Sequence, residues 1–217
     1  MGGTMRVLTI RGIPINVHVS WLVIYGLITW TLATGYFPHA LPDVPAAAHW
    51  ANGLLAAFLL FVSVLLHELS HSFVAMAHGL SVRGITLHVF GGVSHLEDEP
   101  PTPRAEFLIA VVGPLTSGIL AALFGIAAGL GRDVLSRPLA GTLGYLAWTN
   151  LLLAVFNLVP GFPLDGGRLL RSAIWKATGS IGQATRIASM AGQAVGWLLV
   201  AGGVVYLLGG NLAGGIW

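Results

Sequence analysis

A long uncharged segment, interrupted by three ionisable side chains, most constrains this chain. Residues 51–66 (ANGLLAAFLLFVSVLL) carry no charge, and residues 72–80 (SFVAMAHGL) are nearly as apolar. Such a run predicts a helix that crosses a membrane. Residues 67–71 between them read HELSH, and an acidic side chain near the bilayer centre costs roughly 2.5 to 3.5 kcal/mol. A glutamate and two histidines at this depth therefore need a binding or catalytic role.

The composition also indicates a membrane protein. Hydrophobic residues make up 55% of the 217 residues and charged residues only 8%, against about 25% charged residues in soluble domains. The absence of cysteine excludes disulfides and cysteine-ligated metal. A net charge of +2 is too small to indicate a nucleic-acid partner. The expected fold class is an all-α polytopic membrane protein.

Apolar segments of about twenty residues predict where the chain crosses the bilayer. We expect five of them, at residues 17–37, 51–79, 105–130, 139–160 and 187–208. No clear small-residue cleavage site follows the first, so it is interpreted as a retained helix and not as a signal peptide. A sixth helix would begin near residues 214–217, which gives five to six transmembrane helices. We expect one transmembrane core domain over residues 1–217.

Residues 82–97 (VRGITLHVFGGVSHLE) interrupt this series of helices. They are too short and too polar to cross a membrane, are rich in β-branched side chains, and are broken by Gly91-Gly92. This pattern predicts a small membrane-associated β-hairpin.

The distribution of Lys and Arg predicts the orientation if the helices alternate sides. With the N-terminus in the cytoplasm, eight of the ten basic residues lie inside, and only Arg132 and Arg137 lie outside. We therefore expect a multi-pass cell-membrane protein with a cytoplasmic N-terminus. About sixteen residues of the second span, at roughly 1.5 Å each, then precede His67. The HELSH segment is expected in the cytoplasmic half of the bilayer.

The HELSH segment has the pattern H-E-x-x-H, whose spacing brings the two histidines together on a helix. Residues four apart lie on the same face, so the imidazoles of His67 and His71 can bind one cation. Glu68 flanks that face, where its carboxylate can take a proton from an attacking water. The pattern predicts a metal-dependent hydrolytic site.

Two histidines leave a catalytic zinc site incomplete, because such sites usually have three protein ligands. Glu106 begins the third span and is expected to face water. Five other acids lie in predicted loops: Asp43, Glu97, Asp98, Glu99 and Asp133. Asp165 remains as the candidate third ligand.

Asp165 lies in residues 157–168 (NLVPGFPLDGGR), which begin at the end of the fourth span. The prolines and glycines predict a helix that breaks, turns and restarts with Asp165 near the new N-terminus. Irregular backbone at membrane depth is tolerated where protein buries it or water reaches it, as in the wall of an active site. The alternative is that Asp165 only caps a helix at the membrane surface.

Together these two motifs resemble the site-2 protease family of intramembrane zinc metalloproteases. Members of that family carry H-E-x-x-H and a distal N-x-x-P-x-x-P-L-D-G, and residues 67–71 and 157–166 match both at every defined position. Gly113-Pro114 in the third span is also similar to the family. Two motifs in the right order are far more specific than either alone, and the likeness covers most of the chain.

The resemblance implies an endopeptidase that cuts the transmembrane helix of a protein substrate within the lipid bilayer. It implies Zn²⁺ held by His67, His71 and Asp165, with Glu68 as general base, and these are the four residues reached above. Asn157 would hydrogen-bond the substrate backbone or the developing oxyanion. Alternatively, Asn157 makes only a polar contact between helices.

The resemblance also implies that a substrate helix unwinds before it is cut. The edge of the hairpin at 82–97 would then receive the extended segment by strand addition. If a proline at Val89 left cleavage unchanged, this hypothesis would fail.

Other functions stay open at the level of the sequence. Intramembrane His and Asp also mark ion pathways, so a metal-ion transporter using the same residues is a second hypothesis. A catalytically silent relative that only binds transmembrane helices is a third. Cobalt or iron could also occupy a site of two His and one Asp. Some family members continue into a sixth helix and a cytoplasmic regulatory domain, so we expect a shortened chain or a naturally short one, with any regulatory partner unidentified.

Overall fold

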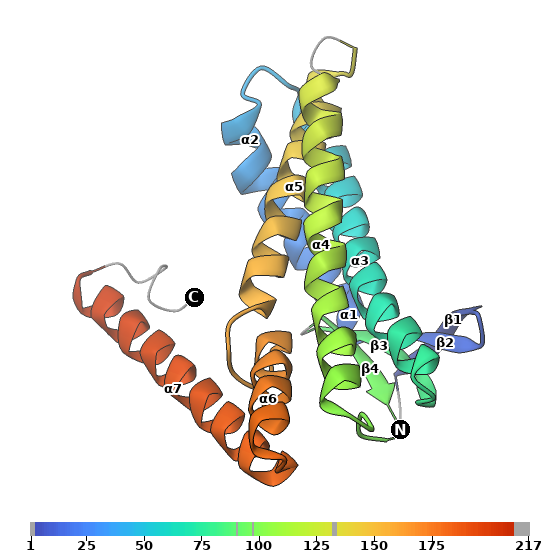
Figure 1. The fold of residues 1–217 in the computed structure, drawn as a ribbon. Coiled ribbons are helices and arrows are strands. Elements are labelled where there is room, and N and C mark those ends of the chain that lie inside the picture. The colour runs from blue at the N-terminus through green and yellow to red at the C-terminus, as the bar shows by residue number, and fades with distance from the viewer. Residues whose placement is uncertain (1–2, 90, 97, 132–133, 211–217) are drawn as a thin grey trace. The chain divides into compact units, whose positions relative to one another are not determined.

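The computed structural model describes residues 3–89, 91–96, 98–131 and 134–210 (Figure 1). The chain divides into two compact units, one of Met1–Pro100 with Val112–Val155 and one of Pro101–Val111 with Phe156–Trp217. Four features of the sequence analysis lie outside the described residues: Glu97, Arg132, Asp133 and the start of a sixth helix at 214–217.

Among the described residues, four helices are long and apolar enough to cross a membrane. They are α3 (Ala46–Ala77), α4 (Pro103–Leu130), α5 (Arg137–Asn157) and α7 (Ile181–Leu208). Each corresponds to a predicted span, and the largest shift is at the start of α7, at residue 181 instead of 187. The chain is a multi-pass membrane protein that is mostly helical and carries one small sheet.

The first predicted span is helical as three consecutive segments. These are α1 (Ser20–Thr31), the π-helix η1 (Leu32–Tyr36) and α2 (Phe37–Ala40). Helical backbone begins at residue 20 and not at residue 17, because β2 (Ile13–His18) occupies the preceding residues. The π-helix is a local widening of the helix, so the helical path is continuous from residue 20 to residue 40.

Four strands form one mixed sheet in the order β1-β2-β3-β4. Strands β3 (Val82–His88) and β4 (Gly91–Leu96) pair antiparallel, which confirms the hairpin predicted at residues 82–97. A second hairpin, formed by β1 (Thr4–Ile10) and β2, was not predicted. Strand β2 pairs in parallel with β3 and thereby joins the two hairpins.

The sheet packs on the helix that carries the H-E-x-x-H motif. Ile13 and Ile15 of β2 and Ile85 and Leu87 of β3 form a buried cluster with Leu69 of α3. All five side chains are at most 5% exposed. Because Leu69 lies within the motif, burial of this cluster holds the C-terminal third of α3 against the sheet.

Polar side chains join α3 to α5 within the same unit. Asn150 Nδ2 donates to Ser63 Oγ at 3.2 Å, and both residues are at most 1% exposed. Hydrogen bonds between helices are a common stabilising contact in membranes. Ser63 precedes His67 by one helical turn, so this contact lies on the face of α3 that carries the histidines.

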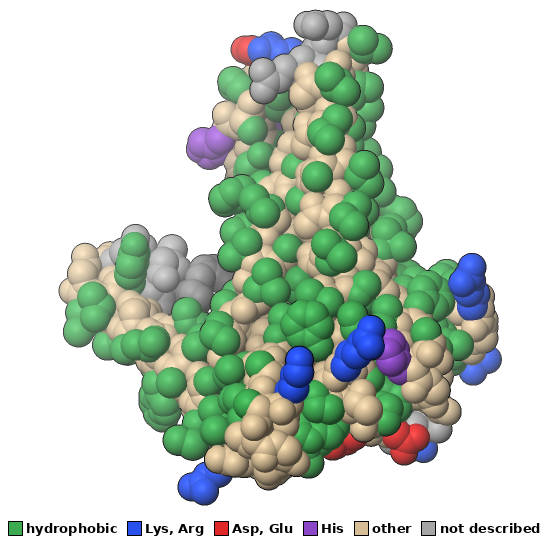
Figure 2. Space-filling model, in the orientation of Figure 1, with side chains coloured by type: hydrophobic (Ala, Val, Ile, Leu, Met, Phe, Trp, Pro, Cys, Tyr) green, Lys and Arg blue, Asp and Glu red, His purple; other side chains and the backbone are tan. Residues whose placement is uncertain are grey.

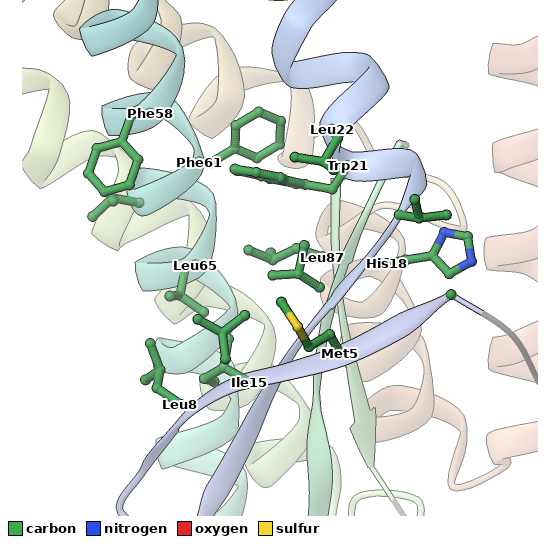
Figure 3. Close-up of a pocket in the computed structure, with 15 residues that line it drawn as sticks. Met5, Leu8, Ile15, His18, Trp21, Leu22, Phe58, Phe61, Leu65 and Leu87 are labelled. Atoms are coloured by element: carbon green, nitrogen blue, oxygen red, sulfur yellow. The ribbon is translucent and has the colours of Figure 1, made fainter.

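An apolar hollow of about 470 Å³ lies between the N-terminal hairpin, α1 and α3 (Figure 3). Its walls include Met5 of β1, Trp21 of α1, and Phe58 and Leu65 of α3. Met5 and Phe58 are 68% and 52% exposed. Hydrophobic side chains are also abundant on the face drawn in Figure 2. Large apolar surfaces of this kind suit a chain surrounded by hydrocarbon.

The second unit contains the predicted break after the fourth span. Helix α5 ends at Asn157 and α6 begins at Asp165 and ends at Thr178. The intervening segment folds back on itself, with Gly161 N–H donating to the Val159 carbonyl at 2.9 Å. A Cβ at Gly166 would collide with the backbone of that segment, so glycine permits this close return.

The prediction that Glu106 faces water is wrong. Glu106 is 0% exposed and accepts a hydrogen bond from Arg171 Nε at 2.5 Å, and Arg171 Nη2 contacts the same carboxylate oxygen. The Arg171 guanidinium also lies over the ring of Phe162, at 5.5 Å from its centroid. An unpaired buried charge is costly, so the two groups are buried together. The pair ties the first turn of α4 to α6 and to the segment that precedes Asp165.

Candidate metal centre

His67 and His71 lie one turn apart on α3, as the spacing predicts. Their side chains are buried, at 4% and 5% exposure, and their ring centroids are 4.8 Å apart with an interplanar angle of 74°. A long helix that packs on the sheet and on neighbouring helices fixes both rings. The structure therefore brings together two of the three predicted metal ligands.

Both rings direct an Nε2 atom toward the same point on α4. A Cβ built on Gly113 would lie 2.6 Å from His67 Nε2, and it would also collide with His71 Nε2. Real side chains do not approach so closely, so residue 113 must be glycine for these rings to keep their positions. The two nitrogens converge above a backbone that has no side chain, which leaves a cradle of the kind a cation could occupy.

Ser117 lies one turn after Gly113 on α4 and is fully buried. Its Oγ lies 2.9 Å from His67 Nδ1. A hydrogen bond at Nδ1 fixes the ring orientation and leaves Nε2 available as a ligand. Ser117 was not predicted from the sequence. Its spacing of four from Gly113 is the only local signal that it shares the face pointing at the histidines.

The side chain of Glu68 lies beside the sheet. A Cβ at Gly92 of β4 would lie 2.7 Å from Glu68 Cγ, so glycine again permits a close approach. One turn further along α3, Ser72 Oγ contacts Ser94 Oγ at 2.9 Å and also donates to the Glu68 carbonyl at 2.9 Å. These contacts hold β4 alongside the half-buried Glu68 carboxylate.

Asp165 and Asn157 belong to the other unit. Asn157 is the last residue of α5 and Asp165 is the first residue of α6, and both are partly buried. The helix cap position is Leu164, with no side-chain capping bond. Asp165 is therefore not at the position where a capping carboxylate usually lies, which weakens the capping alternative.

The donor set fits a transition metal. Two buried imidazoles offer Nε2 atoms to one point, a hydrogen bond orients one of them, and a carboxylate on the same helix lies within one residue of a ligand. Imidazole nitrogen is a common zinc ligand. A membrane helix with an H-E-x-x-H motif whose two histidines are buried at such a cradle is typical of membrane-embedded metallopeptidases.

Sequence comparisons agree with this class. The model of Peptidase family M50 matches residues 55–137 and 125–200. The chain is 41% identical over 217 residues to the putative zinc metalloprotease sll0528 of Synechocystis sp., covering all of this chain and 56% of that protein. It is 44% identical over 209 residues to the putative zinc metalloprotease Rip3 of Mycobacterium tuberculosis, covering 96% of this chain and 53% of that one. The chain spans about half the length of these curated relatives.

A solved structure gives the same result. The site-2 protease from Methanocaldococcus jannaschii is similar with a TM-score of 0.63 and 31% identity, over 97% of this chain and 88% of that one. The chain belongs to peptidase family M50. This confirms the family resemblance inferred from the two motifs, and it does not favour the metal-ion transporter.

Proposed function

We propose that this chain is the catalytic core of an intramembrane zinc endopeptidase that hydrolyses peptide bonds within transmembrane helices of membrane-anchored substrates. The observation that carries the proposal is the convergence of His67 and His71 Nε2 on Gly113, with Glu68 on the same helix. Membership of peptidase family M50 and relatives named as zinc metalloproteases support it.

His67 and His71 would hold the zinc, with Asp165 as the third ligand. The two imidazoles supply nitrogen donors, and the carboxylate supplies the oxygen donor that a catalytic site of this kind commonly uses. Zinc bound there would act as a Lewis acid, making water a nucleophile near neutral pH and polarising the scissile carbonyl. The position of Asp165 at a helix restart, after a segment that folds back, supports this assignment.

Glu68 and Asn157 would perform the remaining steps. The Glu68 carboxylate takes a proton from the attacking water and delivers it to the nitrogen of the leaving amine. The Asn157 amide donates a hydrogen bond to the substrate backbone or to the oxygen that becomes negative in the transition state. The peptide C–N bond breaks, and the product has a new carboxylate and a new amine.

The first test measures metal content together with cleavage. Purified chain in proteoliposomes should cut some members of a panel of single-span peptides, lose this activity to a zinc chelator and regain it with added Zn²⁺. His67→Ala, His71→Ala and Asp165→Ala should each bind less than half as much zinc as the unaltered chain, since each removes one of three ligands. His39→Ala, which alters an exposed histidine on α2, is the control. Full zinc content in Asp165→Ala would remove that residue from the ligand set.

The cradle at Gly113 gives a second prediction. Gly113→Ala should lower zinc affinity at least tenfold, because the added methyl group would occupy the space at the two Nε2 atoms and displace the rings. Gly118→Ala on the same helix is a matched control, since a Cβ there has open space around it. Zinc titration of both variants in detergent measures the difference. Equal affinities would show that the metal does not bind at this cradle.

A substrate segment is proposed to pair with β4. This strand is the last in the described sheet, and its contacts with α3 place it beside Glu68. A chain added to its outer edge gains backbone hydrogen bonds that compensate for the lost helical ones. Val89 is a poor place to test this idea, because it lies in the turn before β4 and its N–H donates to Ser20 Oγ at 3.3 Å.

Backbone methylation of the substrate is the sharper test of strand addition. A peptide N-methylated two residues from the cut should be cleaved about tenfold less well, because each methyl group removes one donor and blocks one edge contact. The same peptide N-methylated ten residues away is the control. Equal cleavage of both peptides would argue against pairing at β4.

The sheet also supports a fifth span. The chain leaves the sheet at the end of β2 and returns at the start of β3 after α3, whose 32 residues are long enough to cross a bilayer. A return through α3 requires an outward crossing before it, and helical residues 20–40 supply roughly 32 Å at 1.5 Å per residue. We propose five spans within one core domain, a cytoplasmic N-terminus and a site in the cytoplasmic half, as the basic residues favour.

A further inference from the structure

A surface groove lies between the start of α4 and the C-terminal half of α6, within the second unit. Its volume is about 540 Å³, and its walls include Thr102, Pro103, Arg104, Phe107, Ser172 and Lys176. None of these residues belongs to the proposed peptidase site. The groove is therefore a candidate binding site separate from the proposed peptidase site.

Contacts between α4 and α6 fix the walls of the groove. Ser172 Oγ of α6 donates to the Pro103 carbonyl of α4 at 2.9 Å. The ion pair between Glu106 and Arg171 ties the same two helices together and is almost completely buried. A groove with such walls keeps its shape before any ligand arrives, so less ordering cost accompanies binding.

The open side of the groove carries two cationic side chains. Arg104 and Lys176 are exposed, and neither side chain makes a hydrogen bond or ion pair with another described residue. Phe107, one helical turn after Arg104, is 45% exposed. The groove therefore combines positive charge with an uncovered aromatic surface. On the face drawn in Figure 2, Lys and Arg side chains lie among hydrophobic ones.

The position of the groove at the start of α4 indicates which ligand it binds. Helix α4 begins at Pro103 and is long and apolar enough to cross a membrane, so its first turn lies at the end of a span. Lipid phosphates lie at the level of a span's end. Phe107 lies one turn further along the span, where acyl chains begin. Basic pockets at the ends of membrane helices bind anionic lipid head groups.

We propose that this groove binds one anionic phospholipid, with its phosphate between Arg104 and Lys176 and an acyl chain against Phe107. The lipid bridges α4 and α6, and α6 is the helix that begins with Asp165. This site depends on the membrane location of α4 and not on catalysis. Its test can therefore be performed on a Glu68→Gln chain, and its failure would leave the peptidase proposal untouched.

The experiment compares lipids on the purified full chain. Nanodiscs of phosphatidylcholine with increasing phosphatidylglycerol are used to measure the melting temperature, and native mass spectrometry counts the lipids retained after release. Phosphatidylglycerol should raise the melting temperature, with one molecule retained. Arg104→Ala with Lys176→Ala should lower the apparent affinity on the order of tenfold, because two cations are lost.

Arg186→Ala is the matched control, since Arg186 is exposed on α7 of the same unit and does not line the groove. The double variant and the control must melt alike in pure phosphatidylcholine, and Arg104→Gln with Lys176→Gln replaces the alanine pair if they do not. An equal response of double variant and control to phosphatidylglycerol would overturn the proposal.

A second arm separates a lipid from a soluble anion. Glycerol phosphate has no acyl chain, and its phosphate monoester carries about −1.5 to −2 charge near neutral pH, at least as much as the phosphodiester of phosphatidylglycerol. It should nevertheless stabilise the chain far less than phosphatidylglycerol does. Phe107→Ala should weaken the response to the lipid and leave the response to glycerol phosphate unchanged. If glycerol phosphate stabilises as well as the lipid, the groove is a soluble-anion site and the lipid proposal is wrong.

Discussion

Glu68→Gln should lower the rate of peptide cleavage by about 10² to 10⁴-fold, the range expected on loss of a general base. The amide has nearly the same size as the carboxylate, so it can keep the close contact with Gly92, but it cannot accept the proton of the attacking water. His67 and His71 are unchanged, and bound zinc should stay near one per chain. Cleavage of single-span peptides in proteoliposomes and metal analysis of the same samples measure both quantities.

Glu99→Gln is the control, because it makes the same chemical change at an exposed loop residue. It should cut at the rate of the unaltered chain. If Glu68→Gln also cuts at that rate, the general base is another residue. If Glu68→Gln loses its zinc, Glu68 acts in metal binding or folding. If the chain is instead a transporter, the unaltered chain should cleave no peptide, and Glu68→Gln should alter the metal flux.

Glu106→Ala should lower the free energy of unfolding by about 3 to 5 kcal/mol, the cost of leaving one partner of a buried ion pair alone. Arg171 would remain almost fully buried without its carboxylate. The loss should also loosen the segment before Asp165, since the Arg171 guanidinium lies over Phe162. Melting in detergent measures the first effect, and zinc titration measures the second.

A second ion pair supplies the control. Asp43 and Arg137 are 3.8 Å apart, and their side chains are 82% and 81% exposed. Asp43→Ala should therefore change stability by only about 0 to 1 kcal/mol. Glu106→Leu combined with Arg171→Met should recover most of the stability lost in Glu106→Ala, because no charge is then buried. A melting temperature of Glu106→Ala equal to that of Asp43→Ala would contradict this account.

Local sequence patterns predicted the membrane helices and the motif residues well. Long apolar runs determine where a helix can cross a bilayer, whatever its neighbours are. The spacing of His67 and His71 determines that both face one way on a helix. The prolines and glycines around Asp165 predict a helix restart near that residue, and α6 begins there. Each of these inferences needs only contiguous residues. The role of Asp165 as a ligand stays a prediction.

The N-terminal hairpin was missed although part of its signal is present. Ile13, Ile15 and Val17 alternate with other residues in the period of a strand, and Arg11 and Gly12 form a turn in which both have positive φ, 47° and 88°. An apolar helix follows directly, and the predicted start of that helix, at residue 17, included the end of this alternating segment. The pairing of β2 with β3 connects residues 15 and 85, and no local pattern specifies such a partner.

The roles of Glu106, Gly113 and Ser117 have the same explanation. An acid at the end of a span normally faces water, and only the arrangement of α4 and α6 shows that Glu106 meets Arg171, which is 65 residues away in sequence. Gly113 was noticed as part of a motif, but its contact with the two histidines depends on how α4 packs on α3. Contacts between helices far apart in the chain were therefore the part that the sequence did not predict.

The parallel pairing of β2 and β3 imposes an order on biosynthesis. Ile15 pairs with Ile85, which a ribosome adds seventy residues later, or roughly 4 to 14 s at 5 to 20 residues per second. Throughout that interval the nascent N-terminal hairpin has an open inner edge, which is a surface prone to wrong pairing. The sheet can close only after α3 has been made. We therefore expect the first two membrane segments to insert as a pair before the N-terminal hairpin finds its final partner.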